Sequence, residues 1–89
     1  MEKIINIGII GAGVVAERII NASKINPRVN IKSIYDLNLE RLSEITTKYN
    51  IEAANSQKDL LMNKDIDVVY LAVPPKYHYP IALDIFKAR

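Results

Sequence analysis

The sequence has no cysteine, no tryptophan and a single histidine. Without cysteine, the chain has no disulfide framework, no thiolate metal site and no cysteine nucleophile. One histidine among scattered carboxylates provides no metal-ligand spacing, so we predict no metal site. An excess of one charge is also lacking, because 12 basic and 10 acidic residues give a net charge of +2. The basic residues form no stripe, so nothing favours nucleic acid as a partner.

Long apolar segments are missing as well. The most apolar stretch, Ile4 to Val15, contains Asn6 and three glycines and follows no strongly basic region. It is too short to span a bilayer, and no clean cleavage site follows it. We therefore expect neither a membrane span nor a signal peptide, which favours the cytoplasm. The 89 residues form one small domain at most.

The most informative feature is a glycine turn that joins a strand pattern to a helix pattern. Lys3 to Ile10 is a nearly continuous apolar run, typical of a parallel strand covered on both faces. The motif Gly11-Ala12-Gly13-Val14-Val15-Ala16 follows, and a helical pattern runs from Val14 to about Ile25. A strand, a tight turn and a helix in this order match the dinucleotide-binding fingerprint.

Each small residue of this turn has a physical role in that interpretation. Gly11 allows the backbone to turn sharply off the strand, and Gly13 lets a pyrophosphate approach the main chain because it has no Cβ. Ala16 lets the helix pack closely on the strand. The free N–H groups of the first helical turn, together with the helix dipole, would meet the negative charge of the ligand.

An acidic residue stands at the spacing that the fingerprint requires. Ile31 to Asp36 is the pattern of a second strand, and Asp36 ends it about 20 residues after the turn. As a functional residue, Asp36 would accept the adenosine ribose hydroxyls and favour NAD over NADP, because a carboxylate repels a 2′-phosphate. The alternative is a turn aspartate that caps the next helix. Arg41 and Lys32 are expected to lie too far from the strand end to reverse this preference, which leaves NADP open.

The rest of the chain alternates helices and strands. Glu44 and Lys48 have the spacing of a favourable i,i+4 pair. Tyr70 is expected in the core or facing a helix, and Met62 is expected in the core. In the first helix, the expected apolar side consists of Val15, Ile19 and Ala22. The other expected elements are a helix capped by Asn38 with the stripe Leu39, Leu42, Ile45 and Tyr49, a strand at Ile51–Ala54, a short helix after Ser56 that ends by Asn63, a strand at Ile66–Val73, and a helix from about Pro80.

This alternation predicts an α/β fold, with a parallel sheet of strand order 3-2-1-4 and right-handed crossovers. The switch point then lies between the first and fourth strands. Gly11 to Val14 and Ala72 to Pro75 would face each other across the crevice in which such folds bind ligands.

The whole chain resembles the N-terminal domain of one family, the glucose–fructose oxidoreductase and inositol dehydrogenase group (Gfo/Idh/MocA). The resemblance rests on the Ile7–Gly13 opening, the strand end Tyr35-Asp36, the strand Asp67–Pro74, and a histidine followed by Ile81-Ala82-Leu83. It implies a partial NAD(P)-binding Rossmann domain over residues 1–89. The family's enzymes transfer hydride between a nicotinamide and a hydroxyl carbon of sugars, inositols and related polyols.

The resemblance also assigns residues to the cofactor. It implies a pyrophosphate turn, an acceptor for the adenosine ribose, a stretch that lines the cofactor, and a histidine near it. The expected cofactor-binding residues are Gly11, Ala12, Gly13, Val14, Val15, Asp36, Ala72, Val73, Pro74 and His78. Pro75 departs from the asparagine usual in the family, and the chain ends before the family's Glu-Lys-Pro motif. We therefore expect no catalytic residue here and no activity from these 89 residues alone.

Two other functions stay open at this point. One is a non-enzymatic nucleotide-binding or redox-sensing module, and the other is a remnant that keeps the fold without a ligand. If no fifth strand follows, the apolar strand Ile66–Val73 becomes an exposed sheet edge, and such edges pair with other chains. We therefore expect a homo-oligomer through this edge.

Overall fold

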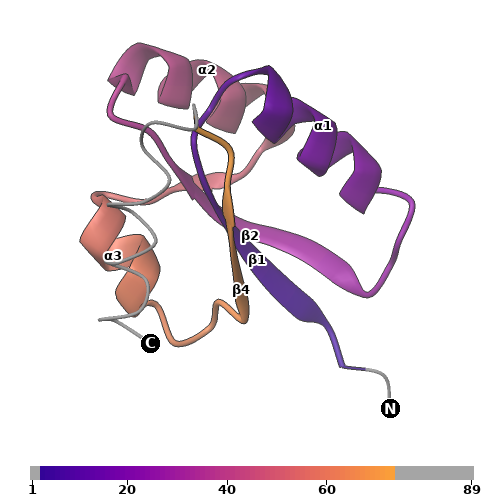
Figure 1. The fold of residues 1–89 in the computed structure, drawn as a ribbon. Helices are drawn as coiled ribbons and strands as arrows, with labels where there is room; N and C mark the ends of the chain where they lie inside the picture. Colours follow the sequence, from indigo (N-terminus) through magenta and orange to yellow (C-terminus); the bar gives the residue numbers. More distant parts are fainter. Residues whose placement is uncertain (1–2, 74–89) are drawn as a thin grey trace.

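A computed structural model describes residues 3–73 of the chain. It contains a parallel sheet with strand order β3-β2-β1-β4, as the sequence predicts (Figure 1). The elements are β1 (Ile5–Ile10), α1 (Val14–Ser23), β2 (Val29–Tyr35), α2 (Leu39–Tyr49), β3 (Glu52–Ala53), α3 (Gln57–Met62) and β4 (Val68–Leu71). The helix predicted from about Pro80 lies outside the described residues.

Helices cover both faces of this sheet, with α1 and α2 on one face and α3 on the other (Figure 1). Neighbouring residues of β1 serve the two layers, because successive side chains of a strand point to opposite faces. Ile9 is fully buried in the cluster that includes Ala16 of α1 and Leu42 of α2. Ile10 packs with Leu60 of α3 in a second cluster. Two cores therefore hold the carboxyl end of β1 in the middle of the fold.

Local hydrogen bonds set the helix boundaries that the sequence predicts. The Asn38 side chain accepts from the Arg41 N–H at 3.2 Å, which satisfies a free donor at the start of α2. Asn50 ends that helix in the left-handed conformation with φ of 54°. At the start of α3, the Ser56 hydroxyl accepts from the Asp59 N–H at 3.0 Å.

The buried face of α1 differs from the predicted one. Ala16 and Ile20 are buried, whereas Val15 and Ala22 are exposed. The glycine turn determines the rotation of this helix, because it directs Ala16 against β1, and the residue four positions later then lies on the same face. The helix also ends at Ser23, where bonds from each N–H to the carbonyl three residues earlier tighten the last turn.

The fourth strand is shorter than predicted, with Val68–Leu71 in place of Ile66–Val73. Ile66 is buried, but its N–H donates to the Asn63 carbonyl in a turn and not to the sheet. Met62 is 58% exposed, so the prediction that it is a core residue is wrong, and Tyr70 at 46% exposed is not in the core either. Val68 is similarly exposed on β4, at the edge of the described sheet.

Candidate functional site

The carboxyl ends of three strands meet at one edge of the sheet. Ile10 at the end of β1 pairs with Tyr35 of β2 on one side and with Leu71 of β4 on the other. The residues that follow these strand ends are Gly11, Asp36 and Ala72. Because parallel α/β sheets bind ligands beyond the carboxyl ends of their strands, this edge is the candidate site.

Gly11 is required by the fold itself. Its φ is +118°, a backbone conformation that residues with a side chain rarely adopt. Its N–H donates to the Tyr35 carbonyl at 2.7 Å. A Cβ at this position would overlap the Ala72 carbonyl oxygen and lie 2.6 Å from the carbonyl carbon. It would also stand 3.2 Å from Cγ1 of Val73. The turn thus lies directly against the end of β4, as the switch-point prediction requires.

Gly13 is different, because nothing in the fold requires a glycine there. Its backbone is extended, with φ of −96° and ψ of −158°, and any residue can adopt this conformation. Within the described part of the chain, the nearest atom to a Cβ built on Gly13 is Nη1 of Arg41, at an ordinary contact distance of 3.6 Å. Among residues 3–73, the space around Gly13 is therefore open. No side chain caps α1, and Val14 and Val15 in its first turn are exposed.

Asp36 connects the glycine turn to the segment after β2. Its Oδ2 accepts from the Ala12 N–H at 2.7 Å, and its Oδ1 accepts from the Asn38 N–H at 2.8 Å. The residue that caps α2 is Asn38. The alternative role of Asp36, as the cap of this helix, therefore belongs to Asn38 two residues later.

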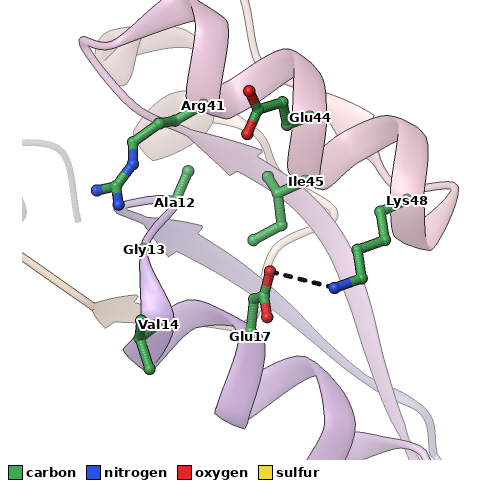
Figure 2. A pocket seen from close by; sticks show the side chains of 8 residues that line it. All are labelled: Ala12, Gly13, Val14, Glu17, Arg41, Glu44, Ile45 and Lys48. Atoms are coloured by element: carbon green, nitrogen blue, oxygen red, sulfur yellow. Dashed lines mark ion pairs between the residues drawn. The ribbon is translucent and has the colours of Figure 1, made fainter.

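A pocket of about 250 Å³ lies between α1 and α2, beside the glycine turn (Figure 2). The Lys48 ammonium lies 3.6 Å from a Glu17 carboxylate oxygen and joins the two helices. The predicted i,i+4 pair between Glu44 and Lys48 is not formed, because Lys48 reaches across to Glu17 instead. The lining residues are Ala12, Gly13, Val14, Glu17, Arg41, Glu44, Ile45 and Lys48.

Arg41 is the site residue that the sequence reasoning missed. It was expected to lie too far from the strand end, but its guanidinium lies beside Ala12 and Gly13 (Figure 2). Within residues 3–73, no carboxylate forms an ion pair with it. Two signals were available in the sequence. Asn38 as the cap puts Arg41 in the first turn of α2, and the strand order 3-2-1 puts α2 next to α1.

The structure brings together most of the predicted cofactor residues. Gly11, Ala12 and Gly13 form the turn, Asp36 bonds to it, and Ala72 with Val73 lies against it. Pro74 and His78 lie outside the described residues. Across residues 3–73, no group of three or more histidine, cysteine or acidic side chains is arranged to hold a metal ion. None of the helices in that range is long and apolar enough to cross a membrane.

Comparison with known proteins identifies the family. Residues 5–89 match the model of the oxidoreductase family GFO_IDH_MocA, described as an NAD-binding Rossmann fold. The chain belongs to this family. Over 91 aligned residues it is 33% identical to the uncharacterized oxidoreductase YrbE of Bacillus subtilis (strain 168), with 100% of this chain and 26% of YrbE covered. The chain thus spans about a quarter of the length of that relative.

Solved structures share the fold at lower sequence identity. GenD2 from gentamicin A biosynthesis, in complex with NAD, has a TM-score of 0.88 and 19% identity, with 97% of this chain and 25% of GenD2 covered. The biliverdin reductase of Synechocystis sp. PCC 6803, in complex with biliverdin and NADP+, has a TM-score of 0.85 and 21% identity, over 94% of this chain and 27% of the reductase.

A third structure is the WlbA dehydrogenase of Chromobacterium violaceum, in complex with NADH and UDP-GlcNAcA. Its TM-score is 0.88 and its identity is 21%, over 99% of this chain and 26% of WlbA. At these identities the three structures establish the Rossmann fold of the chain. The family model adds that the fold binds a nicotinamide dinucleotide.

Proposed function

We propose that this chain is the cofactor-binding part of an NAD(P)-dependent oxidoreductase that acts on a sugar, an inositol or a related polyol. The observation that carries the proposal is the space that residues 3–73 leave open at Gly13, at the start of α1, beside the Arg41 guanidinium and next to the residue that Asp36 holds. A fold that does not need glycine at this position nevertheless has one. A pyrophosphate group would fill the space that a Cβ would otherwise occupy.

The proposed cofactor residues contact different parts of the dinucleotide. Gly13, Val14 and Val15 offer backbone N–H groups and the positive end of the helix dipole to the pyrophosphate. Asp36 accepts hydrogen bonds from the adenosine ribose hydroxyls, through lone pairs that its two bonds to backbone N–H groups leave free. We further propose that Ala72, Val73, Pro74 and His78 line the cofactor, as the family resemblance implies.

Arg41 changes the expected choice between NAD and NADP. The Asp36 carboxylate by itself disfavours a 2′-phosphate, but both of its oxygens already accept backbone N–H bonds. The Arg41 guanidinium beside Gly13 forms no ion pair with a carboxylate of residues 3–73, and it supplies a positive charge and several donors, which suit a phosphate. We propose that the chain accepts NADPH as well as NADH, with Arg41 as the residue that tolerates the extra phosphate.

Hydride transfer to and from the nicotinamide is the chemistry that the bound cofactor would supply. The part of it that falls to this chain is to hold and orient the dinucleotide. Support for a sugar-like substrate comes from the family resemblance and from WlbA, whose structure contains UDP-GlcNAcA. The biliverdin complex of the Synechocystis reductase shows that the same fold also occurs with a ligand that is not a sugar.

The test uses the protein expressed from its complete reading frame, with NAD+ or NADP+ and a panel of inositols and sugars. We expect reduced nicotinamide to appear, as measured by its absorbance, with at least one polyol. The matched control is the Gly13→Val variant, which should lose this activity while remaining folded. A protein that binds the cofactor but oxidises none of the panel would favour the redox-sensing alternative.

A further inference from the structure

We propose that Asp36 is also a positioning residue, which holds the glycine turn in its binding shape before any cofactor arrives. This inference rests on the proposed function, because the turn it concerns is the proposed pyrophosphate site. The inference goes beyond the ribose contact, because it gives Asp36 a role in binding the pyrophosphate, which Asp36 itself does not touch.

The Asp36 carboxylate bridges two parts of the chain. Its two oxygens bond to two segments that are far apart in the sequence, through the Ala12 N–H at 2.7 Å and the Asn38 N–H at 2.8 Å. The bond to Asn38 fixes the orientation of the carboxylate, and the bond to Ala12 fixes the middle of the turn. Charge-assisted bonds of this length are among the stronger ones in proteins.

The burial of Ala12 raises the cost of losing its bond to Asp36. The residue is 7% exposed, so a loss of the Asp36 oxygen would leave its N–H with poor access to water. The turn would then have to move to satisfy this donor. Any such movement would shift Gly13 and the first amides of α1, because they follow Ala12 directly in the chain.

One consequence concerns the division of donors within the turn. Because Asp36 accepts the Ala12 N–H, that group is not free for the pyrophosphate, and the donors left for it are those from Gly13 onward. Ala12 therefore anchors the turn, whereas the sequence predicts that it binds the cofactor itself. Each Asp36 oxygen keeps a second lone pair, so the anchor and the ribose contact are compatible.

The chain contains a matched control for this inference. Asp67 accepts a backbone N–H bond at the other end of β1, where its Oδ2 lies 2.9 Å from the Asn6 nitrogen. Both residues place a carboxylate on a backbone N–H at an end of β1, although the Asp67 bond is more exposed and its Oδ1 also lies 4.0 Å from the Lys3 ammonium. Asp67, however, lies at the amino end of the strand, away from the glycine turn. Asp67→Ala should therefore reproduce the loss of a strand-end bond without disturbing the turn.

The experiment compares Asp36→Ala, Asp36→Asn and Asp67→Ala with the original chain. The probes are ADP and 2′,3′-dideoxy-ADP, which keeps the diphosphate but has no ribose hydroxyls for Asp36. Affinities come from NMR titration, and the same samples give the hydrogen exchange of the Ala12 amide. We expect Asp36→Ala to bind dideoxy-ADP about tenfold more weakly, the effect of one displaced hydrogen bond to a charged group. Its Ala12 amide should exchange faster.

Asp36→Asn and Asp67→Ala separate the loss of the Ala12 bond from a general loss of stability. Asn at position 36 has one carbonyl oxygen and can keep only one of the two backbone bonds, so its affinity should lie between those of the original chain and Asp36→Ala. Asp67→Ala should bind both probes as the original chain does. Equal weakening in Asp67→Ala and Asp36→Ala would contradict the inference, since it would show a loss of general stability.

Two further outcomes separate this inference from the proposed function. If Asp36→Ala weakens ADP but leaves dideoxy-ADP and the Ala12 exchange unchanged, Asp36 serves the ribose alone and the positioning role is wrong. If the original chain binds neither ADP nor NADH, the proposed function fails instead. The exchange of the Ala12 amide then decides the positioning role, and unchanged exchange in Asp36→Ala overturns it.

Discussion

The two glycines of the turn should respond oppositely to the same small change, the addition of one methyl group. In Gly11→Ala, the new Cβ meets a backbone at φ of +118° and overlaps the Ala72 carbonyl. A non-glycine residue in such a conformation costs about 1–3 kcal/mol. Crowding of a packed region adds roughly 1–3 kcal/mol more. A small domain has only on the order of 5–10 kcal/mol of stability, so this variant should lose a large share of it and unfold at a clearly lower urea concentration.

Gly13→Ala should leave the free energy of unfolding within about 1 kcal/mol of its original value. The backbone at Gly13 is extended, and within residues 3–73 the added Cβ would contact Nη1 of Arg41 alone, at 3.6 Å. Replacing glycine stabilises by about 0.4–1 kcal/mol through the unfolded state, and the loss of glycine at the helix cap offsets part of that gain. The same methyl group occupies the proposed pyrophosphate space, so NADH should bind at least about tenfold more weakly, a change of roughly 1.4 kcal/mol.

The assay for this pair is urea unfolding followed by circular dichroism, together with calorimetric titration of each folded variant with NADH. Gly13→Ala that remains folded and binds NADH at the original affinity would refute the assignment of the open space to the cofactor. Gly11→Ala as stable as the original chain would refute the close approach of the turn to Ala72. Both results are independent of any substrate.

Three other predictions concern Arg41, the α1 packing and the sheet edge. Arg41→Ala should weaken the binding of NADPH about tenfold more than that of NADH, because the loss of a hydrogen bond to a charged group costs roughly 1.5–3 kcal/mol. The control is Arg18→Ala, which removes an exposed arginine on α1. Equal weakening of both cofactors by Arg41→Ala would argue against a contact between Arg41 and the 2′-phosphate. Ala16→Leu should lower the free energy of unfolding by about 1–3 kcal/mol, since Ala16 is fully buried against β1, and an unchanged urea midpoint would contradict this. If β4 forms the edge of the sheet, Tyr70→Lys should reduce the self-association expected through it, as measured by sedimentation, and a chain that is already monomeric at high concentration would contradict that expectation.

Much of this fold follows from local chemistry that a sequence displays directly. The strand order rests on the alternation of strands and helices and on the handedness of their connections. The caps at Asn38 and Ser56 and the left-handed stop at Asn50 involve residues close in sequence, so their side-chain types predict them. Gly11 and Asp36 are also identified in this way, because the fingerprint fixes their spacing from strand ends.

The features that the sequence did not reveal depend on how separate elements are placed. The rotation of α1 about its axis decides whether Ala16 or Val15 is buried, and only the packed turn sets it. Arg41 joins the site because α2 lies next to α1, and the bond between Asp36 and Ala12 joins residues 24 positions apart. Lys48 likewise prefers Glu17 on the neighbouring helix to the carboxylate on its own helix.

The central claim is that the glycine turn of this chain binds a nicotinamide dinucleotide. The most direct test is calorimetric titration of the folded chain with NADH and with NADPH, repeated on Gly13→Val. We predict saturable binding to the original chain and no detectable binding to the variant, whose side chain fills the pyrophosphate space. A folded original chain that binds neither cofactor, or a Gly13→Val variant that binds as well as the original, would contradict the account.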